Sequence, residues 1–188
     1  MTIKVYAIEK VVLFGDSLMA GYGLSNEHHL SVVLKESLIA DGFNIEVING
    51  SVSGSTSSGG LNRAEWTLSE SDVDLMILGL GANDMLRGIN PKETKNNLEE
   101  IIKIAKSKNM KVIIAGMIAP TSYGFSYKKS FDKIFSDLSK KYKLQLIPFL
   151  LEGVAQKAEF NLSDGMHPND QGTIIVGNTL KKAILENL

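Results

Sequence analysis

Short apolar runs alternate with longer amphipathic stretches along this chain. The central runs are apolar at nearly every position, which is typical of strands that are covered by helices on both faces of a parallel sheet. We expect five strands, at residues 11–15, 45–50, 74–81, 111–117 and 144–149.

The stretches between these runs have helical periodicity. In the third of them, Leu98, Ile101 and Ala105 lie on one apolar stripe, and Pro91 suits the first turn of a helix. Alternation of strands and helices predicts an α/β fold, a three-layer α/β/α sandwich with about five parallel strands and right-handed crossovers. No linker or repeat divides residues 1–188, so we expect a single domain. Helices are expected at residues 29–42, 61–71, 90–109, 126–143 and 172–188.

Composition narrows the class of protein. A net charge of -1 provides no basic surface, which argues against nucleic acid as a partner. The absence of cysteine excludes disulfides, thiolate nucleophiles and cysteine-based zinc sites. No run approaches the roughly 20 apolar residues of a membrane span, so we expect no stable membrane insertion. The oligomeric state is left open.

The start of the chain bears on its compartment. "MTIKVYAIEK" has no apolar core of a signal peptide. As written, the chain is therefore expected to be cytoplasmic. A trimmed mature form of a periplasmic or secreted protein would have the same features.

Candidate chemistry follows the ends of the predicted strands. Ser17 comes directly after the first strand within "FGDSLMAGYG", "SGST" follows the second, and "GAND" follows the third. "DGMHPN", at residues 164–169, precedes the last predicted helix. Because sites in open α/β sheets lie beyond the carboxyl ends of the strands, we expect these four segments to meet at one edge.

Together these segments hold the components of acyl transfer. The hydroxyl of Ser17 needs a base, His167 is the candidate, and Asp164 could fix its tautomer. The developing oxyanion needs donors, which the backbone N–H groups of Ser17 and Gly54 and the side-chain amide of Asn83 could supply.

Each segment alone also has a purely structural interpretation. A serine after a strand often caps a helix, a Gly-rich loop is usually a turn, and Asn83 could cap a turn through its side chain. His28 and His29 are interpreted as surface or pocket-rim residues, because only Glu27 could pair with them at short spacing. The combination of the four segments is what favours catalysis.

The motifs "FGDSLMAGYG", "SGST", "GAND" and "DGMHP" resemble the four sequence blocks of the SGNH hydrolases, or GDSL esterases/lipases. The resemblance is greatest to the bacterial thioesterase I/lysophospholipase/arylesterase branch. It implies a flavodoxin-like SGNH hydrolase fold and no metal or organic cofactor. It also implies roles for individual residues: Ser17 as nucleophile and first oxyanion donor, Gly54 and Asn83 as further donors, His167 as base and Asp164 as its orienting partner.

Two positions depart from the pattern of that branch. Ser55 stands where Asp or Asn is usual, which affects how the second loop is braced. Ala82 stands where Gly is common, and Asn83 is placed correctly only if residue 82 needs no positive φ. We expect Asp16 to fix its loop by a hydrogen bond and not to take part in catalysis.

The resulting prediction is a serine esterase that hydrolyses carboxylic esters or thioesters of short-to-medium acyl groups through an acyl-enzyme. Its partner would be a small-molecule ester or thioester. Two alternatives remain: a carbohydrate deacetylase of the same family, and a flavodoxin-like module that binds phosphate or a nucleotide. The wall of the acyl site is expected from segments after the third and fourth strands, namely Met85, Leu86, Ile118, Pro120, Tyr123 and Phe125.

Overall fold

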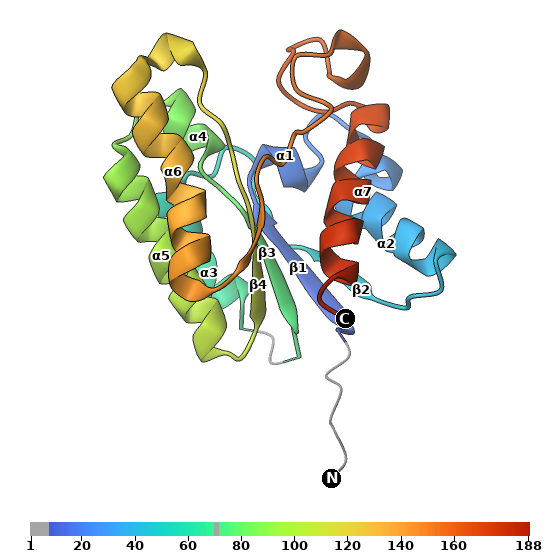
Figure 1. Cartoon of the computed structure of the whole chain (residues 1–188). Coiled ribbons are helices and arrows are strands. Elements are labelled where there is room, and N and C mark those ends of the chain that lie inside the picture. The colour runs from blue at the N-terminus through green and yellow to red at the C-terminus, as the bar shows by residue number, and fades with distance from the viewer. Residues whose placement is uncertain (1–7, 70–71) are drawn as a thin grey trace.

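The centre of the molecule is a parallel sheet (Figure 1). The computed structural model describes residues 8–69 and 72–188. Within them the strand order is β2-β1-β3-β4-β5, which confirms the predicted α/β architecture. The strands are β1 (Lys10–Gly15), β2 (Glu46–Asn49), β3 (Leu75–Gly79), β4 (Lys111–Ala115) and β5 (Gln145–Ile147).

Helices cover both faces of this sheet (Figure 1). Those packed on one face are α3 (Ser57–Thr67), α5 (Pro91–Ser107) and α6 (Phe125–Tyr142), with the short α4 (Ala82–Leu86) beside them. Those on the other face are α2 (Leu30–Ala40) and α7 (Asp170–Leu185). The remaining helical turns are α1 (Ser17–Ala20), η1 (Asn26–His28), η2 (Thr121–Tyr123) and η3 (Ala158–Phe160).

Alternate residues of each central strand enter the two cores. In β1, Val12 and Phe14 pack with α3, α5 and α6, whereas Val11 and Leu13 pack with α2 and α7. All four side chains are at most 1% exposed. Polar side chains would be buried without water on either face of such a strand, which is why the central strands are almost continuously apolar.

One helix begins earlier than the sequence pattern predicts. The expected start of the second helix at residue 61 was wrong, because α3 begins at Ser57. Thr56 caps it, and its hydroxyl accepts a hydrogen bond from the backbone N–H of Gly59 at 3.2 Å. The expected end at residue 71 lies outside the described residues, whereas α3 itself ends at Thr67.

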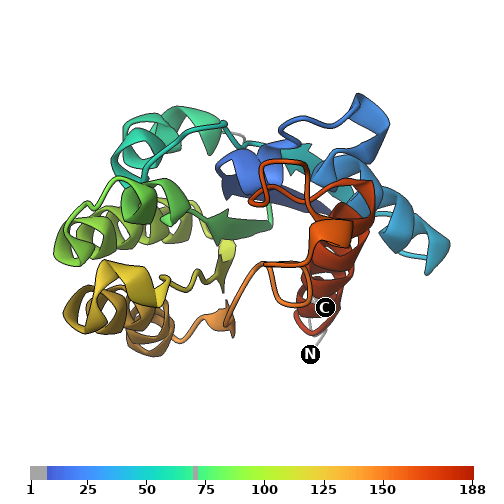
Figure 2. The same ribbon diagram turned by 90° about the horizontal axis from the view of Figure 1, so that it is seen from above.

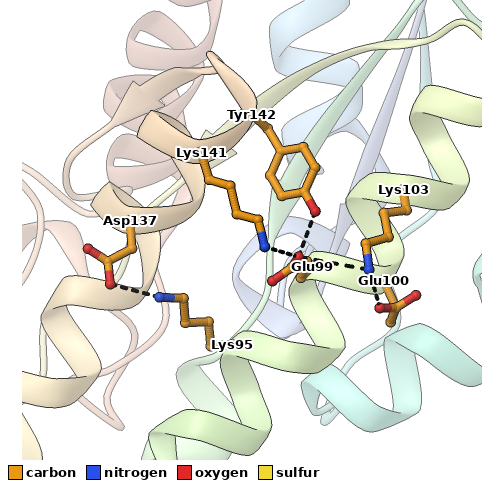
Figure 3. Close-up of polar contacts among 7 residues, drawn as sticks. All are labelled: Lys95, Glu99, Glu100, Lys103, Asp137, Lys141 and Tyr142. Atoms are coloured by element: carbon orange, nitrogen blue, oxygen red, sulfur yellow. Dashed lines mark hydrogen bonds and ion pairs between the residues drawn. The ribbon is translucent and has the colours of Figure 1, made fainter.

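Polar contacts join the outer surfaces of α5 and α6 (Figure 3). Glu99 of α5 accepts hydrogen bonds from the ammonium of Lys141 at 2.5 Å and the hydroxyl of Tyr142 at 2.6 Å. Lys95 pairs with Asp137 at 2.8 Å along the same helix pair. These contacts hold α6 against α5 above the shared core.

The ends of β1 and β3 leave room for α1. Gly15 and Gly79 are paired in the sheet register, and Met19 of α1 packs over both. A Cβ atom at either glycine would lie 2.5 Å from the sulfur of Met19. The two glycines therefore let the first helical turn sit directly on the carboxyl edge of the sheet.

No helix in residues 8–69 and 72–188 is long and apolar enough to cross a membrane.

Candidate active site

Ser17 is the first residue of α1 and follows β1 directly. Asp16 caps this helix, because its Oδ1 accepts a hydrogen bond from the backbone N–H of Leu18 at 3.1 Å. The preceding Gly15 is tied to the loop after β2, since its N–H donates to Ser51 Oγ at 3.0 Å and its carbonyl accepts from Val52 at 3.1 Å. The position of Ser17 is therefore fixed from both sides.

Arg63 of α3 also joins the ends of β1 and β2. One guanidinium nitrogen donates to the carbonyl of Gly15 at 2.9 Å and another to the carbonyl of Gly50 at 2.5 Å. The guanidinium group also lies over the ring of Phe14, 4.0 Å from its centroid. The planar fork of arginine is suited to bridging two fixed carbonyl groups in this way.

Asp164 and His167 lie in one tight turn before α7. Asp164 Oδ1 accepts from the backbone N–H groups of Met166 at 2.8 Å and His167 at 3.0 Å. Its Oδ2 lies 2.7 Å from His167 Nδ1. These donors stabilise the charged carboxylate, and they lower the pKa of Asp164 to about 2.

The ionised carboxylate determines which imidazole nitrogen carries the proton. Asp164 can only accept, so Nδ1 of His167 must be the donor in their contact. In the neutral imidazole, Nε2 is then an acceptor, and it lies 2.8 Å from Ser17 Oγ. The ring of Tyr22 lies against that of His167, with the centroids 4.5 Å apart. The arrangement lets His167 take a proton from the hydroxyl of Ser17.

Asn83 is the second residue of α4. Its Nδ2 is 3.3 Å from Asp16 Oδ2 and 3.2 Å from the carbonyl oxygen of Ser55. The positive φ needed at this turn, +121°, occurs at Gly81 and not at Ala82, which is already helical. Alanine at position 82 is therefore compatible with the position of Asn83, whose amide contacts the loops after β1 and β2.

Gly54 completes the loop after β2. Its φ of +78° is in the left-handed region that favours glycine. No described heavy atom lies within 4 Å of the position that a Cβ atom would take. Glycine is therefore favoured at position 54 by the backbone conformation, and not by lack of space for a side chain. Arg87 donates a hydrogen bond to the carbonyl oxygen of Gly54 at 3.1 Å, and the next residue, Ser55, is buried.

Asp84, next to Asn83, organises a buried network beneath the site. Its carboxylate accepts from the backbone N–H of Ser57 at 2.7 Å, from the Ser57 hydroxyl at 2.5 Å and from the Thr94 hydroxyl at 3.1 Å. Asn97 donates to Ser57 Oγ at 3.0 Å. Asp84, Ser57 and Thr94 are fully buried. The network ties the starts of α3, α4 and α5 together, and it was not found from the sequence.

The carboxyl group of Asp16 is also fully buried. Burial raises the pKa of Asp16 to about 6, although the hydrogen bonds from Leu18 and Asn83 act in the opposite direction. The carboxylate of Asp84 also raises this pKa, whereas His167 in its protonated form lowers it, and Arg63 attracts the ionised carboxylate. Asp16 thus fixes its loop as expected, and it also contacts Asn83.

An apolar cavity of about 450 Å³ opens beside Ser17. Four of the six predicted wall residues line it: Met85, Leu86, Ile118 and Pro120. Tyr123 and Phe125, the other two, are not among its lining residues. η2 turns Tyr123 onto Tyr127, with ring centroids 5.5 Å apart, and the side chain of Phe125 is 81% exposed.

The sequence reasoning missed other parts of the wall. The segment after β5 folds across the cavity, and the same rule on the ends of strands would have included it. Further lining residues are Leu18, Tyr22, Met117, Phe149, Leu151, Ala155, Gln156 and Met166.

His28 and His29 lie away from these groups. His28 Nδ1 is 3.0 Å from Asp170 Oδ1 at the start of α7, and neither histidine is among the residues that line the cavity. The structure thus places them outside the cluster of Ser17, Asp164 and His167.

The sequence is similar to known proteins along nearly the whole chain. Residues 13–173 match the GDSL-like Lipase/Acylhydrolase family. This chain belongs to that family. It is 35% identical to an arylesterase of Vibrio mimicus over 97% of this chain and 91% of that protein. It is 30% identical to thioesterase 1/protease 1/lysophospholipase L1 of Escherichia coli strain K12, over 98% of this chain and 87% of that protein.

Solved structures agree with the family assignment. The crystal structure of TesA matches with a TM-score of 0.90 at 30% identity, covering 96% of this chain and 100% of that one. AlinE4, an SGNH-hydrolase family esterase, matches with a TM-score of 0.81 at 34% identity, covering 97% of each chain. This member of the GDSL-like family is therefore an ester hydrolase, as predicted.

Proposed function

We propose that Ser17 is the nucleophile of this ester hydrolase, with His167 as its base and Asp164 as the residue that orients the base. The observation that carries this proposal is the continuous chain of contacts from Asp164 Oδ2 through His167 to Ser17 Oγ, at 2.7 and 2.8 Å. Both distances are within hydrogen-bonding range for a nucleophile and its base.

The proposed oxyanion hole consists of the N–H groups of Ser17 and Gly54 and the Nδ2 of Asn83. Ser17 begins α1, so its N–H has no partner within that helix. Gly54 and Asn83 both line the cavity beside Ser17. Asp16 and Ser55 position the amide of Asn83, whose two N–H groups face their oxygen atoms in the structure. One of these two contacts is exchanged for the oxyanion when Asn83 donates to it.

The proposed reaction has two halves. Ser17 Oγ bonds to the carbonyl carbon while its proton passes to His167 Nε2, and the carbonyl oxygen becomes the oxyanion. The tetrahedral intermediate then expels the alcohol or thiol, which takes the proton from His167. Water repeats the sequence on the acyl-enzyme: it gives a proton to His167, the acid product leaves, and Ser17 regains its proton.

The proposed substrates are carboxylic esters or thioesters of short-to-medium acyl groups. The relatives named arylesterase and thioesterase/lysophospholipase support this class. The volume of about 450 Å³ and the mostly apolar lining support an acyl chain in the cavity. An acetylated sugar is less well supported, because its small acetyl group would leave the apolar wall unfilled.

Covalent labelling with an organophosphonate ester tests the assignment of the nucleophile. We expect one phosphonyl group per chain, located at Ser17 by peptide mass spectrometry, together with full loss of esterase activity. Ser53→Ala is the matched control, because Ser53 also lines the cavity but contacts neither His167 nor Asp164 in the described network. Label at another residue, or labelling that persists in Ser17→Ala, would refute the assignment.

A further inference from the structure

Several exposed apolar side chains belong to segments at the carboxyl edge of the sheet, on which Ser17 and His167 lie and which we call the catalytic edge. Eleven large apolar side chains are exposed among the described residues, and six of them belong to segments that follow strand ends or precede α7. Figure 2 looks down on this edge of the sheet. We call the six the apolar rim: Tyr22, Val52, Leu86, Ile118, Phe125 and Met166.

The rim continues the wall of the cavity outward. Tyr22, Leu86 and Met166 line the cavity and are also about half exposed, at 51%, 51% and 50%. Val52 and Phe125 do not line the cavity, yet they are 50% and 81% exposed. A single ester whose acyl chain fills the cavity would leave these two side chains in water. The rim is therefore wider than one dissolved substrate molecule requires.

Phe125 is the most exposed member and has a cation beside it. It is the first residue of α6, and the ammonium of Lys129, one turn later, lies 5.8 Å from its ring centroid. An aromatic ring with an adjacent lysine suits the boundary between an apolar phase and water, because the ring can insert while the ammonium remains hydrated.

We propose that the apolar rim docks onto the surface of an aggregated amphiphilic ester, such as a micelle or bilayer of single-chain lipid esters, from which one molecule enters the cavity. The inference rests on the proposed function, because it assumes that the cavity receives the acyl chain. A lipid ester is the expected partner of the rim because the rim is continuous with the cavity. Four of its side chains line the proposed acyl cavity and are also exposed on the outer face of the molecule: Tyr22, Leu86, Ile118 and Met166.

The direct test measures binding without turnover. Ser17→Ala would be sedimented with vesicles of phosphatidylcholine that contain lysophosphatidylcholine. Adding Phe125→Ser is expected to weaken vesicle binding about tenfold. Tenfold corresponds to ~1.4 kcal/mol, or roughly 55 Å² of apolar surface at about 25 cal/mol per Å². Val52→Ser is expected to weaken binding by a smaller factor, because Val52 exposes a smaller side chain.

Trp66→Ser is the matched control. Trp66 is also 81% exposed, but it lies at the end of α3 that points away from the catalytic edge. It should leave vesicle binding unchanged, and thermal unfolding would check that each variant is folded. The proposal would be overturned if adding Phe125→Ser left vesicle binding unchanged, or if Phe125→Ser and Trp66→Ser weakened it equally.

Two further measurements separate the alternatives. Phe125→Ser in the active chain should hydrolyse a dissolved short-chain ester at the parent rate, but should lose most of the gain in rate when a longer ester forms micelles. Gel filtration tests a second copy of the chain as the occupant: a dimer that Phe125→Ser dissociates, with no vesicle binding by the parent, would overturn the docking proposal. Hydrolysis of lysophosphatidylcholine by Ser17→Ala is measured first on the same vesicles. Hydrolysis there would contradict the assignment of the nucleophile, whereas absent vesicle binding would contradict the docking proposal, so the two failures are distinguished.

Discussion

The buried carboxyl group of Asp16 should give the folded protein a distinctive dependence on pH. Its pKa is about 6 in the folded chain against 3.8 for the unperturbed group, because burial disfavours the charged form. Below about pH 4 both states are protonated. As the pH rises toward 6, the unfolded chain loses this proton first, so the free energy of unfolding falls.

The size of the effect follows from the shift in pKa. A difference of about two units corresponds to ~3 kcal/mol, and this contribution to stability is lost between about pH 4 and pH 6. Asp16→Asn removes the titrating group and should not show this loss. Lost hydrogen bonds also change the stability of the variant, but that change is the same at every pH. The difference between variant and parent across the pH range therefore isolates the titration of Asp16.

Urea unfolding at half-unit steps from pH 3.5 to 7.5 measures this difference. Relative to the parent, Asp16→Asn should gain ~3 kcal/mol across the window from about pH 4 to 6. Asp164→Asn is a control with a different window: the pKa of Asp164 is lowered to about 2, so its stabilisation is lost only as the pH falls from about 4 toward 2. A difference between parent and Asp16→Asn that does not vary with pH would refute the reasoning.

Three further predictions concern the supports of the site. Asp84→Ala should lower stability by about 3 kcal/mol, because three buried donors lose their acceptor, and calorimetry should show a melting temperature lower by roughly 6–12 °C. A fall of under 2 °C would show that the network contributes little. Glu99→Gln should cost about 1 kcal/mol at pH 7, because Lys141 and Tyr142 lower the pKa of Glu99 (Figure 3). That cost should shrink as the pH falls through the lowered pKa of Glu99, and chemical unfolding at a series of pH values from 7 downward measures it. Met117→Trp should shift the preferred ester to a shorter acyl chain, because Met117 lines the cavity; an unchanged profile of rate against chain length would remove it from the acyl wall.

The sequence was informative wherever one physical rule acts locally. Continuous apolar runs located the strands, because both faces of β1, β3 and β4 are buried. The rule that parallel strands end at one edge brought Ser17, Asn83 and His167 together in the prediction, and the structure places them around one cavity.

The misses arose where a side chain depends on distant partners. No pattern around Asp84 indicates that Ser57 and Thr94 share its carboxylate, because these residues are separated in sequence and meet only through packing of three helices. Phe125 follows a strand as predicted, but η2 and α6 direct it outward. The rule on strand ends identifies the edge, whereas the turns within each loop decide which side chains line the cavity.

The most direct test of the account is hydrolysis of p-nitrophenyl esters from acetyl to palmitoyl by the parent protein and Ser17→Ala. The account predicts a maximum at short-to-medium chain length for the parent, and a loss of at least about 10³ in kcat for the variant at every length, with folding unchanged. Hydrolysis by Ser17→Ala at a rate close to that of the parent would contradict the central claim, because another group would then have to be the nucleophile.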